Sequence, residues 1–183
     1  TSYGHANAEG ANGVGAVFYG YTPAYGINSP VLESFSSKGG TPIYLDTLGN
    51  FLTEPITREK PDYCATDGSN TSFFGNDIGF DADIHPNFFG TSAAAPHAAA
   101  LAALMIEASG YSLSPEEVRA TLISTAIDME ASGFDHESGY GLIQADVAVA
   151  ASLQACNGIV VEQAPEDQLF CSGGEARFRV EAS

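Results

Sequence analysis

Basic residues are scarce in this sequence of 183 residues: 6 Lys and Arg stand against 23 Asp and Glu, and the formal charge is −17. Proteins hold nucleic-acid backbones by neutralising phosphates with Lys and Arg, so this balance excludes a nucleic-acid partner. Long apolar runs are absent too, because no uninterrupted stretch approaches the roughly 20 residues of a membrane-spanning helix. The opening residues also lack the pattern of a secretory signal peptide. A surface this acidic suits a secreted, a salt-tolerant or a cation-holding protein, and charge alone does not separate the three.

Cysteine is the next scarce residue type. The three cysteines are an odd number, so at most one intrachain disulfide forms among them. Cys156 and Cys171 flank a compact segment that a bridge could close, which would leave Cys64 as a free thiol. Because spacing in the sequence does not fix the direction of the side chains, this pairing stays open.

The sequence does contain enough apolar residues for one globular domain, since 44% of them are hydrophobic. Glycines followed by apolar residues predict a strand at 10–19, and alternating apolar and polar residues predict another at 31–37. Residues 39–60 predict a surface hairpin with its turn at 46–50. A short apolar stretch at 60–68 then ends in a turn, and a polar loop follows at 69–87.

Three helices are predicted in the second half. Ala and Leu dominate residues 92–109, and because nearly every face is apolar we expect this helix to lie buried in the middle of the domain. Ser114, Pro115 and Glu117 form the start signal of a second helix, with a cap, a first-turn proline and a glutamate three residues after the cap. Residues 142–153 predict a third, shorter helix.

The composition and pattern of the sequence change after Cys156, where proline, acidic residues and strand-like alternation begin. We therefore assign residues 1–155 to one domain and residues 156–183 to a linker or the start of a β-rich module. The abrupt Gly- and Ala-rich opening without a starting Met, together with the strand-like last residues, leads us to expect a piece of a longer protein.

One serine stands where chemistry is expected. In Phe89-Gly-Thr-Ser92, a tight Gly-Thr turn leads directly into the apolar helix, which places Ser92 near the positive end of the helix. The backbone N–H groups there are donors already aimed at an anion, and negative charge develops on a carbonyl oxygen when a serine attacks it. Gly90 leaves room for a peptide to approach. These residue types fit a nucleophilic serine, although a serine that merely caps a helix is the simpler alternative.

The run Gly90-Thr-Ser-Ala-Ala-Ala-Pro-His97 resembles the serine signature of the subtilase family, in which Pro and then His follow the serine by four and five residues. Four further segments resemble family segments in the same order, namely 10–17, 33–39, 60–68 and 139–145. The sequence departs from the family pattern by having Cys64, Thr66 where Pro is usual, and Gln144 in place of Asn. The likeness covers residues 10–153 with gaps.

The resemblance implies the C-terminal part of the catalytic domain of a subtilisin-like serine endopeptidase. The implied fold is α/β, with a doubly wound, mainly parallel sheet and a buried helix that carries the serine. Ser92 would form an acyl-enzyme with a peptide or protein substrate, while Gly90 and Thr91 support the turn and the oxyanion. The localisation implied is secreted or cell-surface.

The rest of the catalytic machinery is not found. In subtilisins the catalytic Asp and His precede the serine, and the resemblance places the oxyanion Asn upstream as well. No histidine here has the expected surroundings: His5 lacks them, and His97 lies five residues after the serine, whereas neighbours on one helical face are three or four apart. His85 and His136 are loop residues. We therefore expect this chain to be inactive alone, to require the N-terminal part of the same domain, and to self-associate through uncovered surfaces.

Alternatives remain at this point. Asp77, Asp81 and Asp83 offer oxygen ligands of the kind calcium prefers, but their spacing is not that of an EF-hand, so no cofactor is the first expectation and calcium the second. A sedolisin-like acid peptidase would share the Gly-Thr-Ser motif but pair the serine with carboxylates. A non-catalytic binding or adhesion scaffold derived from a peptidase domain is the alternative outside the enzymes.

Overall fold

The computed structural model describes residues 2–155, and its centre is a pair of parallel strands. Strand β1 (Val14–Phe18) pairs with β4 (Tyr63–Asp67), with Val14 opposite Tyr63 and Phe18 opposite Asp67. Nearly all residues of both strands are buried, the pattern of strands that are covered on both faces in α/β proteins. The parallel pair confirms the α/β class predicted from the sequence.

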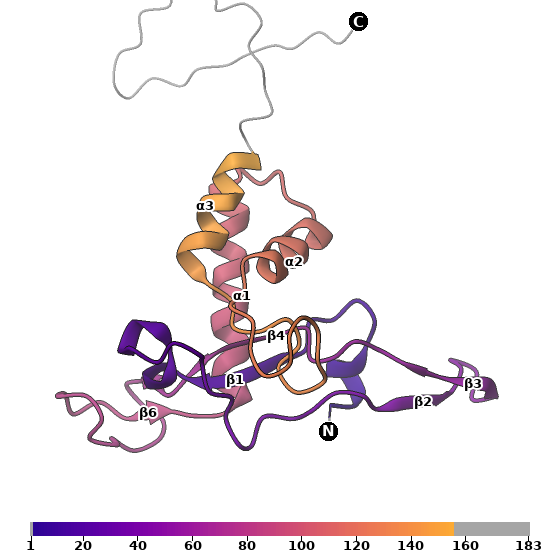
Figure 1. The fold of residues 1–183 in the computed structure, drawn as a ribbon, viewed down its shortest axis with the longest axis horizontal. Helices are drawn as coiled ribbons and strands as arrows, with labels where there is room; N and C mark the ends of the chain where they lie inside the picture. Colours follow the sequence, from indigo (N-terminus) through magenta and orange to yellow (C-terminus); the bar gives the residue numbers. More distant parts are fainter. Residues whose placement is uncertain (1, 156–183) are drawn as a thin grey trace, which may run out of the picture.

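Two small antiparallel pairs are the other paired strands of residues 2–155. Strands β2 (Pro42–Leu45) and β3 (Phe51–Thr57) form the predicted hairpin, which extends away from the body of the molecule (Figure 1). The Asp46 carboxylate accepts the N–H groups of Leu48 and Asn50 and so closes the turn. Strands β5 (Ser69–Asn70) and β6 (Asn87–Phe88) pair at the base of the predicted polar loop. Three short 3-10 turns, η1 (Gly4–Asn7), η2 (Tyr19–Tyr21) and η3 (Pro23–Tyr25), lie in the first part of the chain.

Three helices follow, close to the predicted positions. Helix α1 (Thr91–Ala108) rises from the strands, and α2 (Pro115–Ser124) and α3 (Ala145–Ala155) lie beside it (Figure 1). The capping box predicted for α2 is present: the Ser114 hydroxyl accepts the Glu117 N–H, and the Glu117 carboxylate accepts the Ser114 N–H. No helix within residues 2–155 combines the length and the apolarity needed to cross a membrane.

The core forms where α1 covers the parallel strands. It unites residues from β1, β4, the three helices and the segment just before α3: Ala16, Tyr63, Ala65, Ala94, Ala98, Leu101, Met105, Val118, Leu122, Ile143 and Ala148. Small alanines on α1 let its backbone approach the strands closely. This packing fixes the start of α1 relative to the end of β4.

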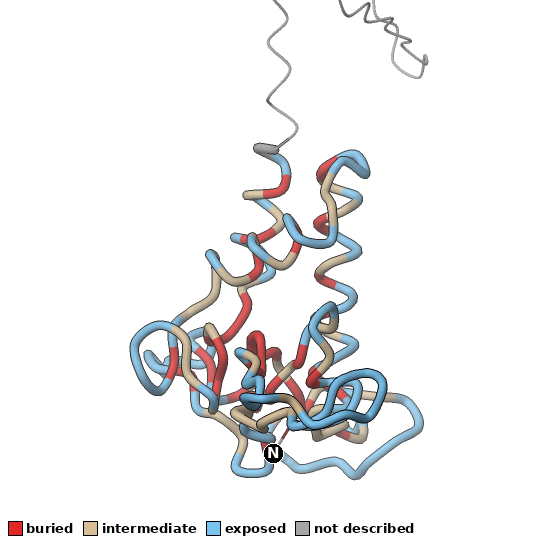
Figure 2. The backbone as a smooth tube through the Cα atoms, turned by 90° about the vertical axis from the view of Figure 1, so that its right-hand side faces the viewer, coloured by how far each residue is buried: buried red, intermediate tan, exposed pale blue. Residues whose placement is uncertain are grey.

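The expectation of a helix buried on all sides needs correction. Within residues 2–155, α1 is buried only on the face toward β1, β4 and α3, and the helical tubes in Figure 2 alternate between buried and exposed residues. Leu104 remains 52% exposed. Most exposed residues of α1 are small or apolar, with Ser92 at its start and Glu107 near its end as the polar ones; the small or apolar residues are Ala95, Pro96, Ala99, Ala100, Ala103 and Leu104. The described part of the chain therefore leaves an apolar helix face uncovered.

One predicted strand and the start of one predicted helix are wrong for a common reason. Residues 31–37 form no strand. Leu32 makes a single bridge to Val17, and the Ser36 side chain, rather than its backbone, accepts the Ala16 N–H. The third helix begins at Ala145 rather than at residue 142, because Leu142 bridges to Cys64 of β4. In both places contacts with distant segments override the local pattern.

Of the cysteine and domain predictions, the structure describes only those that concern residues 2–155. Cys64 is a free, buried thiol in β4. Cys156 and Cys171, and the linker or β-rich module predicted for 156–183, lie outside the described residues.

Candidate active site

Ser92 is the second residue of α1 and is exposed to solvent. Gly90 is the N-cap, and its φ of 115° lies in a region that side-chain-bearing residues rarely adopt. The Gly90 carbonyl accepts the N–H groups of Ala93 at 2.8 Å and Ala94 at 3.2 Å, which begins the helix. The Gly-Thr turn thus leaves Ser92 exposed at the start of α1.

The first N–H groups of α1 stay available. Within residues 2–155 the Thr91 and Ser92 backbone N–H groups make no hydrogen bond, as expected for the first turn of a helix. Together with the partial positive charge of the helix end, these donors suit an oxyanion. Gly90 and Thr91 form the turn directly before Ser92, and their role in supporting an oxyanion stays a prediction.

A buried carboxyl group, which the sequence analysis missed, lies behind this turn. Asp67 ends β4, is 0% exposed, and its Oδ2 accepts the Gly90 N–H at 2.6 Å. Burial raises the pKa of Asp67 above its ordinary value, while the Gly90 N–H and His97 act in the opposite direction. A signal was present in the sequence, since Asp67 stands at the end of the short apolar stretch 60–68.

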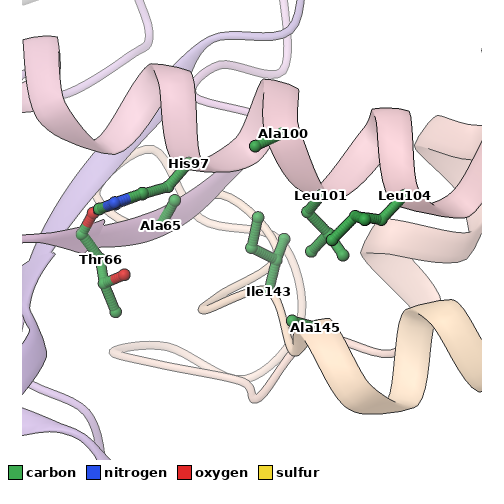
Figure 3. Close-up of a pocket in the computed structure, with 8 residues that line it drawn as sticks. All are labelled: Ala65, Thr66, His97, Ala100, Leu101, Leu104, Ile143 and Ala145. Atoms are coloured by element: carbon green, nitrogen blue, oxygen red, sulfur yellow. The ribbon is translucent and has the colours of Figure 1, made fainter.

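His97 does not face the serine. Its Nδ1 lies 2.6 Å from the Thr66 carbonyl oxygen, and its Nε2 lies 3.3 Å from Ser69 Oγ. Because a carbonyl only accepts, Nδ1 carries a proton and donates to it. Figure 3 shows the ring pointing from α1 toward Thr66 on β4. His97 thus ties α1 to β4, consistent with a packing role.

The other histidines are also apart from Ser92. His5 and His85 are exposed, and the backbone N–H of His85 donates to Asp83. His136 approaches the Lys60 carbonyl with Nδ1 at 3.2 Å. Among the described residues, no imidazole hydrogen-bonds to the Ser92 hydroxyl.

The three loop aspartates bond to protein donors. Asp81 accepts the Tyr19 hydroxyl at 2.7 Å, and Asp83 accepts the Asn70 side-chain amide. Asp77 accepts a backbone N–H within its own turn. Across residues 2–155, no group of three or more His, Cys, Asp or Glu side chains is arranged to hold a metal ion.

An apolar pocket of about 250 Å³ lies along the buried edge of α1 (Figure 3). Its walls come from β4, α1 and the start of α3: Ala65, Thr66, His97, Ala100, Leu101, Leu104, Ile143 and Ala145. Ser92 does not line it. The pocket borders the exposed face of α1 rather than the serine.

Comparisons with known proteins bear on this geometry. Residues 84–141 match the sequence model of the subtilase family. Fervidolysin from Fervidobacterium pennivorans is 36% identical over 70 residues, which is 38% of this chain and 10% of fervidolysin. The chain therefore spans about a tenth of the length of this curated relative.

The solved structure of fervidolysin extends the likeness to the fold. The crystal structure of fervidolysin, a keratinolytic enzyme related to subtilisin, matches with a TM-score of 0.55 and 23% identity, over 80% of this chain and 20% of that one. The psychrophilic subtilisin-like protease Apa1 from Pseudoalteromonas sp. AS-11 is 36% identical over 40% of this chain and 17% of that one, with a TM-score of 0.36. The fold of the described residues is thus that of a segment of a larger structure.

Proposed function

We propose that this chain, a relative of the subtilases with a subtilisin-like α/β fold, supplies the nucleophile of a serine endopeptidase through Ser92. The observation that carries the proposal is the exposed Ser92 hydroxyl on the first turn of α1, beside two backbone N–H groups without acceptors. The match of residues 84–141 to the subtilase family supports it. Its substrate would be a peptide or protein.

The chemistry follows from the positions of these groups. Ser92 Oγ attacks the carbonyl carbon of the peptide bond while a general base takes the hydroxyl proton. The charge that develops on the carbonyl oxygen is met by backbone N–H groups at the start of α1. Collapse of the tetrahedral intermediate expels the amine, which takes the proton from the base, and leaves an ester on Ser92. Water then attacks the ester carbonyl carbon while the base takes its proton, and as the bond to Ser92 Oγ breaks the base returns a proton to that oxygen, which releases the acid and restores the hydroxyl.

The base is the missing part. A serine hydroxyl is a weak nucleophile without an adjacent base, and no described histidine contacts Ser92. We assign the base, its orienting acid and the side-chain oxyanion donor to residues outside 2–155, and we expect this chain to be inactive alone. A secreted or cell-surface location suits the acidic surface and such an activity.

The uncovered face of α1 fits the same proposal. A helix face of small and apolar residues needs a partner, and the described chain supplies none on that side. The chain covers only 20% of the fervidolysin structure with which it shares its fold. We assign this face to the N-terminal part of the same catalytic domain, and we expect the chain without that part to self-associate through it.

A fluorophosphonate probe tests the assignment of Ser92. In the complete protein the probe should label the peptide that contains Ser92, and Ser92→Ala should abolish the label. A wild-type protein that folds but takes no label would refute the peptidase proposal and favour the non-catalytic scaffold. Label that forms only at acidic pH would favour the sedolisin-like alternative. Light scattering of the isolated chain that shows a monomer at every concentration would contradict the self-association.

A further inference from the structure

The buried carboxyl group of Asp67 has a position that no step of the proposed reaction uses. It lies at the end of β4, with both oxygens buried. Oδ2 accepts the Gly90 N–H at 2.6 Å, and Oδ1 has no hydrogen-bond partner among the described residues. Burying a carboxyl oxygen without a partner is unfavourable, so the site keeps this residue at a cost in stability.

The hydrogen bond from Asp67 acts on Gly90, the N-cap residue that sets the direction in which α1 begins. Gly90 has φ of 115° and ψ of 159°, and it directly precedes Thr91 and Ser92. Its carbonyl is fixed by α1 through the N–H groups of Ala93 and Ala94. Its own N–H is fixed by Asp67 alone. The peptide plane before the helix is therefore held from the sheet, and the plane after it is held by the helix.

The surroundings of Asp67 limit which groups can titrate with it. Phe18 of β1 lies opposite it and carries no charge. Glu33 is half-buried nearby. Burial, followed by the Asp67 charge, raises the pKa of Glu33. From α1, His97 favours the ionised form of Asp67. Glu33 and His97 are therefore the two titratable neighbours that an experiment on Asp67 must separate.

We propose that Asp67 is a positioning residue for Ser92, which holds the Gly90 peptide from β4 so that the Ser92 hydroxyl and the first N–H groups of α1 point outward together. Its effect on reactivity rests on the proposed function, whereas its effect on the helix start does not. Asp67 touches no substrate in this proposal. It acts through Gly90 only.

Two replacements of similar size separate the hydrogen bond from packing. Asp67→Asn keeps an oxygen that can accept the Gly90 N–H, whereas Asp67→Leu removes the acceptor. Ser138→Ala is the matched control, because Ser138 is also 0% exposed but bonds to Met129 and Asp135, away from the start of α1. The complete protein is used for all variants.

The first readouts are hydrogen exchange at the Gly90 amide and the rate at which fluorophosphonate labels Ser92. Asp67→Leu should lower both the protection of that amide and the labelling rate by about tenfold or more, the factor expected when a hydrogen bond to a charged group is lost. Asp67→Asn should keep both within about threefold of wild type, since one neutral hydrogen bond replaces it. Ser138→Ala should leave both unchanged even if it lowers the melting temperature. Unchanged Gly90 protection in Asp67→Leu, or equal losses in the Asn and Leu variants, would overturn the positioning role.

A second readout works if Asp67→Leu fails to fold. In wild type the chemical shift of the Gly90 amide proton should follow the titration of Asp67, and this inflection should vanish in Asp67→Asn. Glu33→Gln should remove only the smaller inflection that Glu33 contributes. A Gly90 amide without an Asp67 inflection would refute the proposal. Wild-type protein that takes no probe but shows the inflection would refute the peptidase assignment and leave the positioning of the helix start supported.

Discussion

Removing the Asp62 carboxylate is the sharpest test of what holds β4, the strand that ends in Asp67, in place. Asp62 directly precedes β4 and is 0% exposed. Its Oδ2 accepts the Gly13 N–H and the Lys60 ammonium, both at 2.7 Å, and its Oδ1 accepts Nε of Arg119 at 2.8 Å. One carboxylate thus joins the loop before β1, the start of β4 and helix α2.

The loss of unfolding free energy depends on which positive charge is left buried without its carboxylate partner. Lys60 is 3% exposed, so in Asp62→Ala its ammonium group stays buried with only the Ala11 carbonyl as acceptor. Breaking a buried ion pair by removing one partner costs about 3–5 kcal/mol. The Arg119 side chain is 40% exposed, and water can replace its lost partner, so it adds about 1 kcal/mol or less. The total loss is then about 3–6 kcal/mol, and at about 2–4 °C per kcal/mol for a chain of this size the melting temperature should fall by roughly 6–24 °C.

Urea unfolding followed by circular dichroism measures this loss. Glu54→Ala is the control, because Glu54 is exposed on β3 and its removal changes the net charge equally; it should alter the free energy of unfolding by about 0.5 kcal/mol or less. Lys60→Met combined with Asp62→Ala should cost about 1–3 kcal/mol less than the sum of the two single changes. If Asp62→Ala lowers the free energy of unfolding by less than about 1 kcal/mol, the buried Lys60 ammonium does not depend on Asp62 as inferred.

Three further outcomes are expected. Ser114→Ala removes the cap of α2 and should lower the free energy of unfolding by about 1 kcal/mol, whereas Ser114→Asp, which retains an acceptor, should lower it less; equal losses would contradict the cap. Burial, with the Asp62 charge second, raises the pKa of Tyr63 to about 12 from an ordinary 10.0. The unfolded state therefore loses this proton first, so stability should fall between about pH 10 and pH 12, and Tyr63→Phe should flatten that fall in alkaline unfolding curves. Burial likewise raises the pKa of Cys64 to about 12, so peptide mapping should find this thiol unmodified by iodoacetamide at pH 8 unless urea is present, and rapid native labelling would contradict its burial.

The predictions from sequence succeed where neighbouring residues settle the outcome. The capping box at Ser114, the turn at Asp46 and the long alanine-rich helix depend on bonds within a few residues, and each is present. The exposed position of Ser92 at the start of that helix also follows from the local Gly-Thr turn. The proposal that Ser92 is the nucleophile combines two sources. The structure shows that Ser92 is exposed at the start of α1, and the resemblance to the subtilase serine signature suggests its chemical role.

Predictions fail where partners far along the chain decide. Leu142 was expected to be helical, but the edge of β4 was free to pair with it, and an extended bridge resulted. Residues 31–37 alternate like a strand, yet their contacts with β1 run through one bridge and one hydroxyl. Hydrophobic periodicity describes which residues seek burial, but it does not say which other segment will cover them.

The sequence by itself determined the approximate positions of the helices in residues 2–155, the capping box that starts α2 and the serine at the start of α1, because local hydrogen bonds and side-chain preferences act within a turn or two of chain. Only the tertiary structure decided that Asp67 would lie buried behind Gly90, that His97 would bond to β4 rather than to the serine, and that one face of α1 would remain uncovered within residues 2–155. These relations join residues more than 20 positions apart. They depend on how α1 packs on the parallel strands, which no local preference encodes.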